Sequence, residues 1–310
     1  MQDRYARVIN YLRFSITDRC NHRCFYCMPP DVEFLAKEKL MSLEEILTLG
    51  NIFHSLGIEQ VRITGGEPLM RDDVVQIVKA FSEYFRVSMT TNGSRLKDFA
   101  EDLKGAGLQS VNVSLNSLDE YKFRQITRGE IKPVLDGIDE AIKYQLFVKL
   151  NVVVSKMNID EVPELAKYAS FKGVPIRFIE MMPVGRKNSG AVFEKEILDR
   201  LSSFELKPVS VQLGVGPARY FVTSGGNYVG IISAMSKSFC SFCNKIRLSC
   251  DGKLYPCLGS TIHVDLLQAI RSKYSHQQII QLIQKVLESK PYQHDMNNAE
   301  IDSKMNRLGG

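Results

Sequence analysis

The sequence predicts an α/β fold with parallel strands and crossover helices, followed by a second domain with a different pattern. Three observations lead to this prediction. The chain has 310 residues, of which 44% are hydrophobic and 24% charged. This is a globular composition, and the length suits two domains of about 150 residues each. Short apolar runs alternate with amphipathic stretches up to about residue 180, and this alternation is lost afterwards.

Each apolar run in the first part predicts a strand, and each amphipathic stretch between two runs predicts a helix. Ser42 and Glu45 form a capping box at the start of the first helix, and Gly57 stands where a C′ glycine should end it. Such regular alternation indicates parallel strands joined by helices. The expected strands are residues 11–17, 60–64, 86–90, 110–115, 147–154 and 175–180, and the expected helices are residues 42–56, 72–83, 96–106, 133–144 and 160–171.

The number of units leaves two architectures open for the first part. Six units end near residue 180, whereas a complete eight-stranded barrel usually needs about 250 residues. An incomplete six-unit barrel and an open doubly wound sheet both remain. We place the domains at residues 1–182 and 183–310; in the second, we expect a strand pair at 219–222 and 228–232, a cysteine-rich segment at 238–258 and a helix at 276–288.

Charge and hydropathy exclude several classes of protein. Lysine and arginine total 40 against 35 acidic residues, giving a net charge of +5 spread along the chain. This balance does not indicate nucleic-acid binding, but it suits a pocket for a phosphorylated small molecule. No apolar run approaches the roughly 18 residues of a membrane span, and charges interrupt the N-terminal segment where a signal peptide would be apolar. We therefore expect a cytoplasmic protein without a membrane partner.

The cysteines are clustered, which points to metal or cluster ligation in a cytosolic chain. There are seven, an odd and small number for a disulfide-stapled scaffold. Cys20, Cys24 and Cys27 form a Cys-x3-Cys-x2-Cys array after the first strand, which can hold three irons of a four-iron cluster and leave the fourth iron open. The alternative is zinc, which usually takes four closed ligands, and the nearest spare ligand is His22.

A second array, Cys240-x2-Cys243-x13-Cys257, also supplies three thiolates. A zinc knuckle is the alternative, with Cys250 as a fourth ligand. Two cationic residues follow Cys243 within four positions, and cations beside a metal favour an anionic ligand.

The first array resembles the signature of the radical S-adenosylmethionine superfamily. The turn Gly65, Gly66, Glu67 and Pro68 follows the second strand, as the methionine-binding turn of that superfamily does. The resemblance implies that the open iron binds S-adenosylmethionine, that an electron from the cluster yields a 5′-deoxyadenosyl radical, and that Tyr26 lies against the adenine. On its own, a Gly-Gly-Glu-Pro turn would be an ordinary loop.

Taken whole, the chain resembles the GTP 3′,8-cyclase family, which opens molybdenum cofactor biosynthesis. The matching segments cover nearly the whole chain. They are residues 11–21 (YLRFSITDRCN), 61–68 (VRITGGEP), 90–93 (TTNG), 112–115 (NVSL) and 177–180 (RFIE), the second cysteine array, and the terminal pair Gly309 and Gly310.

This resemblance implies a partial (βα)6 TIM-like barrel with a C-terminal iron-sulfur domain. It implies two [4Fe-4S] clusters and S-adenosylmethionine as cofactors, and a lyase that turns GTP into 3′,8-cyclo-7,8-dihydro-GTP. The deoxyadenosyl radical takes hydrogen from C3′ of GTP, and the carbon radical adds to C8. The implied partners are an electron donor, cyclic pyranopterin monophosphate synthase as the downstream enzyme, and a second copy of the chain in a homodimer.

The resemblance also assigns site residues. The first cluster would be held by Cys20, Cys24 and Cys27, and the second by Cys240, Cys243 and Cys257. S-adenosylmethionine would contact Tyr26, Gly66, Ser114 and Met182. GTP would contact Arg13, Arg62, Thr90, Lys149, Lys245, Ile246 and Arg247, and the tail of Gly309 and Gly310 would reach into the active site.

The residue types support part of this assignment independently. Arg13, Arg62, Lys149 and Arg177 lie in or beside expected strands, so their side chains could enter one lumen. A triphosphate needs several converging cations. A single cationic residue is more often on the surface. Four cations on buried strands are harder to explain without a bound anion, because burying an unpaired charge is costly.

Three positions depart from the family pattern. Asn116 stands where aspartate is usual, Lys245 stands where arginine is usual, and Cys250 is an additional thiol. Because lysine lacks the two-pronged grip of arginine on phosphate, we expect Lys245 to weaken GTP binding.

Three rival functions follow from the same residues. One is another radical enzyme with an auxiliary cluster, such as a peptide-modifying maturase, although those usually carry more C-terminal cysteines. The second is a zinc-bearing nucleic-acid binder, but this chain has no concentrated basic stripe for nucleic acid, and the glycine turn would stay unexplained. An inactive zinc-bearing relative would share the motifs but not consume S-adenosylmethionine.

Overall fold

The structure, a computed structural model, describes residues 1–183, 190–295 and 305–309. Its first half alternates strands and helices as the sequence predicts. The strands are β1 (Tyr11–Ser15), β2 (Gln60–Thr64), β3 (Arg86–Thr91), β4 (Ser110–Ser114), β5 (Phe147–Val154) and β6 (Ile176–Glu180). The helices among them are α1 (Leu43–Ser55), α2 (Val74–Ser82), α3 (Leu96–Gly105), α4 (Glu120–Thr127), α5 (Ile131–Lys143) and α6 (Val162–Phe171).

The second half adds mostly short elements and one long helix. Its strands are β7 (Lys207–Val209), β8 (Arg219–Val222), β9 (Tyr228–Ile232), β10 (Lys245–Leu248), β11 (Lys253–Tyr255) and β12 (Val264–Asp265). Its helices are α7 (Glu194–Arg200), α8 (Leu266–Arg271), α9 (His276–Glu288) and the short C-terminal α10 (Met305–Leu308).

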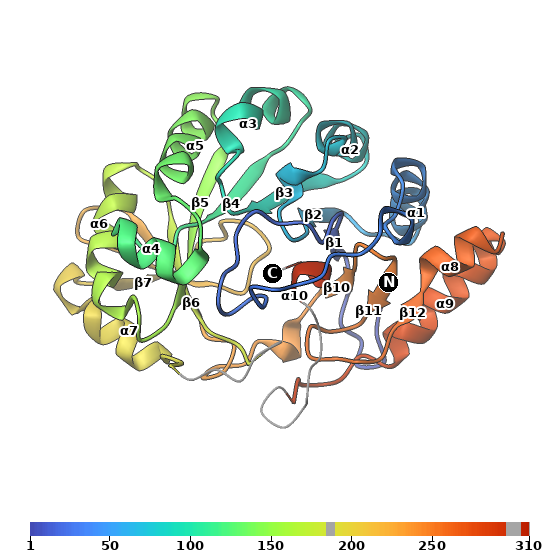
Figure 1. The fold of residues 1–310 in the computed structure, drawn as a ribbon. Helices are drawn as coiled ribbons and strands as arrows, with labels where there is room; N and C mark the ends of the chain where they lie inside the picture. Colours follow the sequence, from blue (N-terminus) through green and yellow to red (C-terminus); the bar gives the residue numbers. More distant parts are fainter. Residues whose placement is uncertain (184–189, 296–304, 310) are drawn as a thin grey trace.

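All these strands join one mostly parallel sheet, in the order β12-β11-β10-β1-β2-β3-β4-β5-β6-β9-β8-β7. Every neighbouring pair from β10 to β9 is parallel, and the strands beyond each of these two are antiparallel. The sheet curves into an open arc with helices α1 to α6 along its outer side (Figure 1). The expected α/β fold, a partial barrel followed by a C-terminal domain, is confirmed.

The outer face of the strands and the inner faces of the helices form the hydrophobic core. Leu12, Val61, Val111, Leu150 and Phe178 are members of this core and are completely buried. Because residues alternate along a strand, the other set of side chains faces the inside of the arc. The core therefore fixes which residues enter the lumen.

Local signals at the first helix are confirmed in detail. Ser42 Oγ accepts from the Glu45 N–H at 3.2 Å, and Glu45 Oε2 accepts from the Ser42 N–H at 2.7 Å. Gly57 follows the helix with a φ of 83°, a conformation that favours glycine.

Four helices have no counterpart among the expected elements: α4, α7, α8 and α10. Each has at most eight residues, so its apolar period is too short to be recognised. The helix α10 lies inside the arc of strands and contacts β1 (Figure 1). None of the helices in the described ranges has the length and apolar character needed to cross a membrane.

Candidate active site

Polar side chains face the inside of the arc, where a closed barrel would carry branched apolar ones. The parallel register places Arg13 beside Arg62 on β1 and β2, and Asn151 beside Arg177 on β5 and β6. Arg62 and Arg177 are buried. Since burying polar and charged groups is costly without partners, such a lumen suits a polar ligand.

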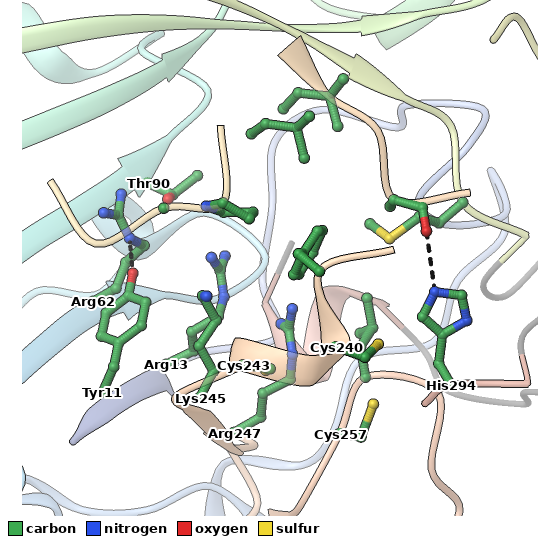
Figure 2. Close-up of a pocket in the computed structure, with 18 of the residues that line it drawn as sticks. Tyr11, Arg13, Arg62, Thr90, Cys240, Cys243, Lys245, Arg247, Cys257 and His294 are labelled. Carbon is green, nitrogen blue, oxygen red and sulfur yellow. Dashed lines mark hydrogen bonds between the residues drawn. The ribbon is translucent and has the colours of Figure 1, made fainter. Parts of the chain in front are cut away.

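A cavity in this lumen has a strongly positive lining (Figure 2). Arg13, Arg62, Arg177, Lys245 and Arg247 line it, and its lining within the described residues includes no carboxylate. Burial, followed by the charge of Arg247, lowers the pKa of Arg13 to about 9. Cations crowded in this way favour an anionic ligand.

Two of these arginines keep N–H groups available for a ligand. Arg62 Nε donates to the Tyr11 hydroxyl, and Arg177 Nε donates to Asn151 Oδ1 at 2.9 Å. Arg62 Nη1 and Arg177 Nη2 are buried and have no hydrogen-bond partner in the part of the chain that the structure describes. Guanidinium groups held in this way are suited to bind phosphate oxygens.

The second cysteine array opens into the same cavity. Cys240, Cys243 and Cys257 all line it, and Figure 2 shows Cys240 and Cys257 beside Arg247. Cys250 is completely buried and is not among the lining residues; its N–H donates to the Arg307 carbonyl at 3.1 Å.

The cations next to the array act on its thiols. Burial raises the pKa of Cys243, but the charges of Lys290 and Lys245 help to outweigh it, so the pKa lies below its usual value. A stabilised thiolate is the form that binds metal. The donor set therefore fits an iron-sulfur cluster.

The first cysteine array lines a second cavity, with Cys20, Cys24 and Cys27 together in its wall. Cys20 Sγ accepts from the His22 N–H at 3.4 Å and from Asn92 Nδ2 at 3.8 Å. Such hydrogen bonds to ligand sulfur are typical around iron-sulfur clusters. Burial raises the pKa of Cys24 to about 11, so metal binding has to displace a proton.

In the described ranges, no three His, Cys, Asp or Glu side chains are placed to hold a single metal ion. Thiolates that bind separate irons of one cluster do not have to converge on one point. His22 packs edge-on against the Phe123 ring, with 6.0 Å between centroids.

The glycine turn after β2 packs directly on the strand-to-cysteine connection. Gly66 N–H donates to the Thr17 carbonyl at 2.8 Å. A Cβ on Gly66 would lie 2.5 Å from the carbonyl oxygens of Asp18 and Arg19, closer than real contacts allow. Only glycine brings the two backbones this close.

Glu67 ties this turn to the loop after β3. Its buried carboxylate accepts from the N–H groups of Leu69 at 3.1 Å and Asn92 at 2.6 Å, and from Thr91 Oγ1 at 2.7 Å. Burial raises the pKa of Glu67 to about 7. Asn92 in turn contacts Cys20, so one carboxylate links the turn to the cysteine loop.

All four residues that the resemblance assigns to S-adenosylmethionine line the second cavity: Tyr26, Gly66, Ser114 and Met182. Asn116 Nδ2 donates to the Tyr26 hydroxyl at 2.8 Å, and Asn116 Oδ1 accepts from the Val153 N–H at 2.9 Å. The Asn116 side chain, at the position where the resemblance implies aspartate, therefore holds the Tyr26 hydroxyl against β5.

The two cavities adjoin. Their linings share Thr90, Asn151, Ile179, Met182 and Met305. A ligand bound in one cavity would thus lie next to a ligand bound in the other.

The C-terminal tail docks between the two halves of this site. Gly309 has a φ of 76°, and its carbonyl accepts from Arg247 Nη1 at 2.7 Å. Asn306 Nδ2 donates to the Asp18 carbonyl at 3.2 Å. Gly310 lies outside the described residues.

Two residues assigned to GTP are not among the lining residues of either cavity. Lys149 is 2% exposed and absent from both linings; its Nζ lies 4.2 Å from the Phe147 ring centroid. The Ile246 side chain belongs to the hydrophobic core, so any contact it makes with a ligand would come from its backbone.

Sequence reasoning missed several residues of the positive cavity: Tyr11, Asn112, Asn151, Lys290 and His294. The first three face inward at alternate positions of expected strands, so extending the alternation by two residues from Arg13, Ser114 and Lys149 would have found them. Lys290 and His294 follow α9 outside any motif, and only the fold brings them to the cavity.

Comparison with family models divides the chain in two. The Radical SAM superfamily matches residues 14–169, and Molybdenum Cofactor Synthesis C matches residues 174–296. The first match runs from the end of β1 into α6 and contains β2 to β5, and the second contains β6 and the second cysteine array.

Relatives with curated names match over the full length. The chain is 42% identical to "GTP 3′,8-cyclase" of Marinobacter nauticus, covering all of this chain and 98% of that protein. It is 39% identical to the protein of that name from Brucella canis, covering all of this chain and 96% of that one.

Solved structures share the fold at low identity. SuiB of Streptococcus suis bound to its precursor peptide SuiA matches with a TM-score of 0.64 at 14% identity, over 85% of this chain and 65% of that one. Native anSMEcpe with bound AdoMet matches with a TM-score of 0.62 at 15% identity, over 92% of this chain and 82% of that one. These low-identity matches establish only the fold, whereas the full-length relatives establish the family. The chain belongs to the Radical SAM superfamily and, within it, to the GTP 3′,8-cyclase family.

Proposed function

We propose that the chain is a lyase that converts GTP to 3′,8-cyclo-7,8-dihydro-GTP, the first step of molybdenum cofactor biosynthesis. The observation that carries the proposal is the pair of adjoining cavities, one with the first cysteine array and the other with the second array and the cations. The full-length relatives named GTP 3′,8-cyclase support it.

Each cavity would hold one [4Fe-4S] cluster. Cys20, Cys24 and Cys27 would bind the first, and Cys240, Cys243 and Cys257 the second. Three thiolates per cluster leave one iron open for a ligand. The chemistry that the first cluster and S-adenosylmethionine supply when bound is a 5′-deoxyadenosyl radical, the hydrogen-abstracting species of the superfamily.

The chain's own residues would place the two ligands. Tyr26, Gly66, Ser114 and Met182 would position S-adenosylmethionine, with Asn116 orienting the Tyr26 ring through its hydroxyl. The triphosphate would be held by the cations of the positive cavity, in which Arg62 Nη1 is buried without a partner in the described part of the chain.

The remaining assigned residues complete the ligand environment. Thr90 lines both cavities and would lie at the boundary between the two ligands. Lys149 would act on GTP through its charge, since it stands in register beside Asn112 of the lining. The tail at Gly309 and Gly310 would close the site, held by Arg247.

The partners follow from the same proposal. An electron donor would reduce the first cluster, and cyclic pyranopterin monophosphate synthase would take the product onward. A cytoplasmic homodimer is the expected form of the enzyme.

The proposal is tested by anaerobic reconstitution with iron and sulfide, followed by S-adenosylmethionine, dithionite and GTP. We expect about eight irons per chain, as two four-iron clusters require, and 5′-deoxyadenosine that accumulates only with GTP. About four irons plus zinc, with 5′-deoxyadenosine formation independent of GTP, would instead indicate another radical enzyme. No consumption of S-adenosylmethionine would indicate an inactive relative.

A further inference from the structure

Lys290 is a buried cation in the wall of the positive cavity that neither the sequence motifs nor the proposed GTP contacts include. It follows α9, is 2% exposed and lines the cavity together with the second cysteine array. Its side chain makes no ion pair with a carboxylate in the described ranges. A buried charge of this kind needs a counter-charge or a ligand.

The hydrogen bonds of Lys290 point to the cysteine array. Its ammonium donates to the Lys245 carbonyl at 2.7 Å and to the Pro256 carbonyl at 2.6 Å. Lys245 is two residues after Cys243, and Pro256 directly precedes Cys257. Strands β10 and β11 are antiparallel, so Lys290 bridges the open end of the hairpin that presents these two cysteines.

Arg7 makes the comparable bond to the third cysteine. Arg7 Nη1 donates to the Cys240 carbonyl at 2.6 Å, and Arg7 Nη2 donates to the Pro291 carbonyl at 2.7 Å. Its charge is already balanced, because Arg7 Nε lies 2.6 Å from the buried carboxylate of Asp3. Lys290 lacks such a carboxylate in the described part of the chain, although its ammonium donates to the carbonyls next to two of the three cysteines.

We propose that Lys290 is a positioning residue for the second cluster and supplies the positive charge that balances it. Three thiolates on a [4Fe-4S] core give a net negative charge, which increases on reduction. A fixed ammonium beside the core therefore favours the reduced state and holds the two loops at ligand distance. This inference rests on the proposed function, because it assumes an iron-sulfur cluster at the second array.

The test compares Lys290→Met with Lys290→Arg, which keeps the charge. The control is Lys285→Met, which removes an exposed lysine of α9. All variants are made in the full chain with Cys20, Cys24 and Cys27 changed to alanine, so that only the second cluster titrates. Iron content, thermal unfolding and an EPR-monitored reductive titration are measured for each.

In Lys290→Met we expect the ratio of reduced to oxidised cluster at a fixed potential to fall at least about tenfold. For a one-electron couple, this corresponds to a reduction potential that is lower by about 59 mV. Loss of the iron from a chain that still unfolds cooperatively would support the same role. Lys290→Arg and Lys285→Met should titrate like the parent. Unchanged iron and an unchanged titration in Lys290→Met overturn the inference, even if GTP binds more weakly, because Lys290 would then act on the substrate. Zinc without iron in the parent would overturn the two-cluster proposal as well.

Discussion

The pKa of Lys149 is lowered because its side chain is buried in the lumen close to other cations. Burial, followed by the charges of Arg177 and Arg62, lowers its pKa to about 7. Between this value and its usual pKa, the unfolded chain binds more protons than the folded chain, so the penalty for burying the charge falls as pH rises. Below pH 7 the penalty is complete.

Replacing Lys149 by methionine should therefore stabilise the cluster-free chain most at and below pH 7. The gain in free energy of unfolding over the parent should shrink by up to about 1.4 kcal/mol per pH unit between pH 7 and pH 10. Urea unfolding of both chains across this range measures it. Lys285→Met, at an exposed site, should give a curve parallel to the parent; a parallel curve for Lys149→Met as well would refute the prediction.

Lys245 stands at a position where the resemblance to the family implies arginine. Its Nζ lies 5.7 Å from the Tyr11 ring centroid and 5.6 Å from that of Phe239, and the residue lines the positive cavity. A guanidinium there would add a second N–H to phosphate oxygen. In Lys245→Arg we expect KM for GTP to fall about tenfold, since one charge-assisted hydrogen bond contributes about 1.5 kcal/mol. An unchanged KM in steady-state assays would count against this.

The site residues that could be predicted from the sequence are those whose spacing along the chain indicates a particular chemistry. The cysteine arrays are recognisable because three thiolates within eight or eighteen residues have few other uses. Lys290 carries no such signal, because its role depends on carbonyls that lie more than thirty residues away along the chain. A single lysine after a helix is, in sequence, a surface residue.

At the scale of elements, the glycine turn after β2 and the cysteine loop after β1 form one unit. Gly66→Ala would force its Cβ against the Asp18 and Arg19 carbonyls and push the two loops apart. We expect S-adenosylmethionine binding to fall at least about a hundredfold, because misplaced binding groups lose most of their affinity. Equilibrium binding to the reconstituted chain measures this.

The matched control is Gly105→Ala in α3, where no heavy atom lies within 4 Å of the added Cβ. That change should leave S-adenosylmethionine binding intact and stabilise the chain by up to about 1 kcal/mol, because alanine favours helix. Parental affinity in Gly66→Ala, with the first cluster loaded, would show that the turn does not need glycine.

The expected strands and long helices were correct because each carries several periods of its pattern. Strands β2 and β5 have the expected bounds, and α9 begins and ends where the sequence indicates. The short helix α4 was missed, since its eight residues carry too few turns of the apolar pattern: it buries only Phe123, Ile126 and Thr127, and the Asp119 side chain caps it by accepting from the Lys122 N–H. Only the folded chain shows that α10 fits inside the arc.

At the scale of the whole molecule, the C-terminal half completes both edges of the N-terminal arc. Strand β10 pairs with β1, although more than two hundred residues separate them, and β9 pairs with β6. No local pattern predicts this pairing, because it depends on how the chain returns across the sheet. The boundary placed at residue 182 stays a prediction, since the sheet continues across it.

The same topology predicts how a truncated chain behaves. Residues 1–182 alone would expose β1 and β6 as unpaired edges, and their inward cations would lose the wall formed by β9 and β10. Exposed parallel edges promote aggregation. We therefore expect this fragment to elute as large aggregates in size-exclusion chromatography, and co-expression with residues 183–310 to recover a complex of the intact chain's size. A monodisperse fragment that unfolds cooperatively would show that the first half is an independent domain, and that the C-terminal strands extend a sheet that is already stable.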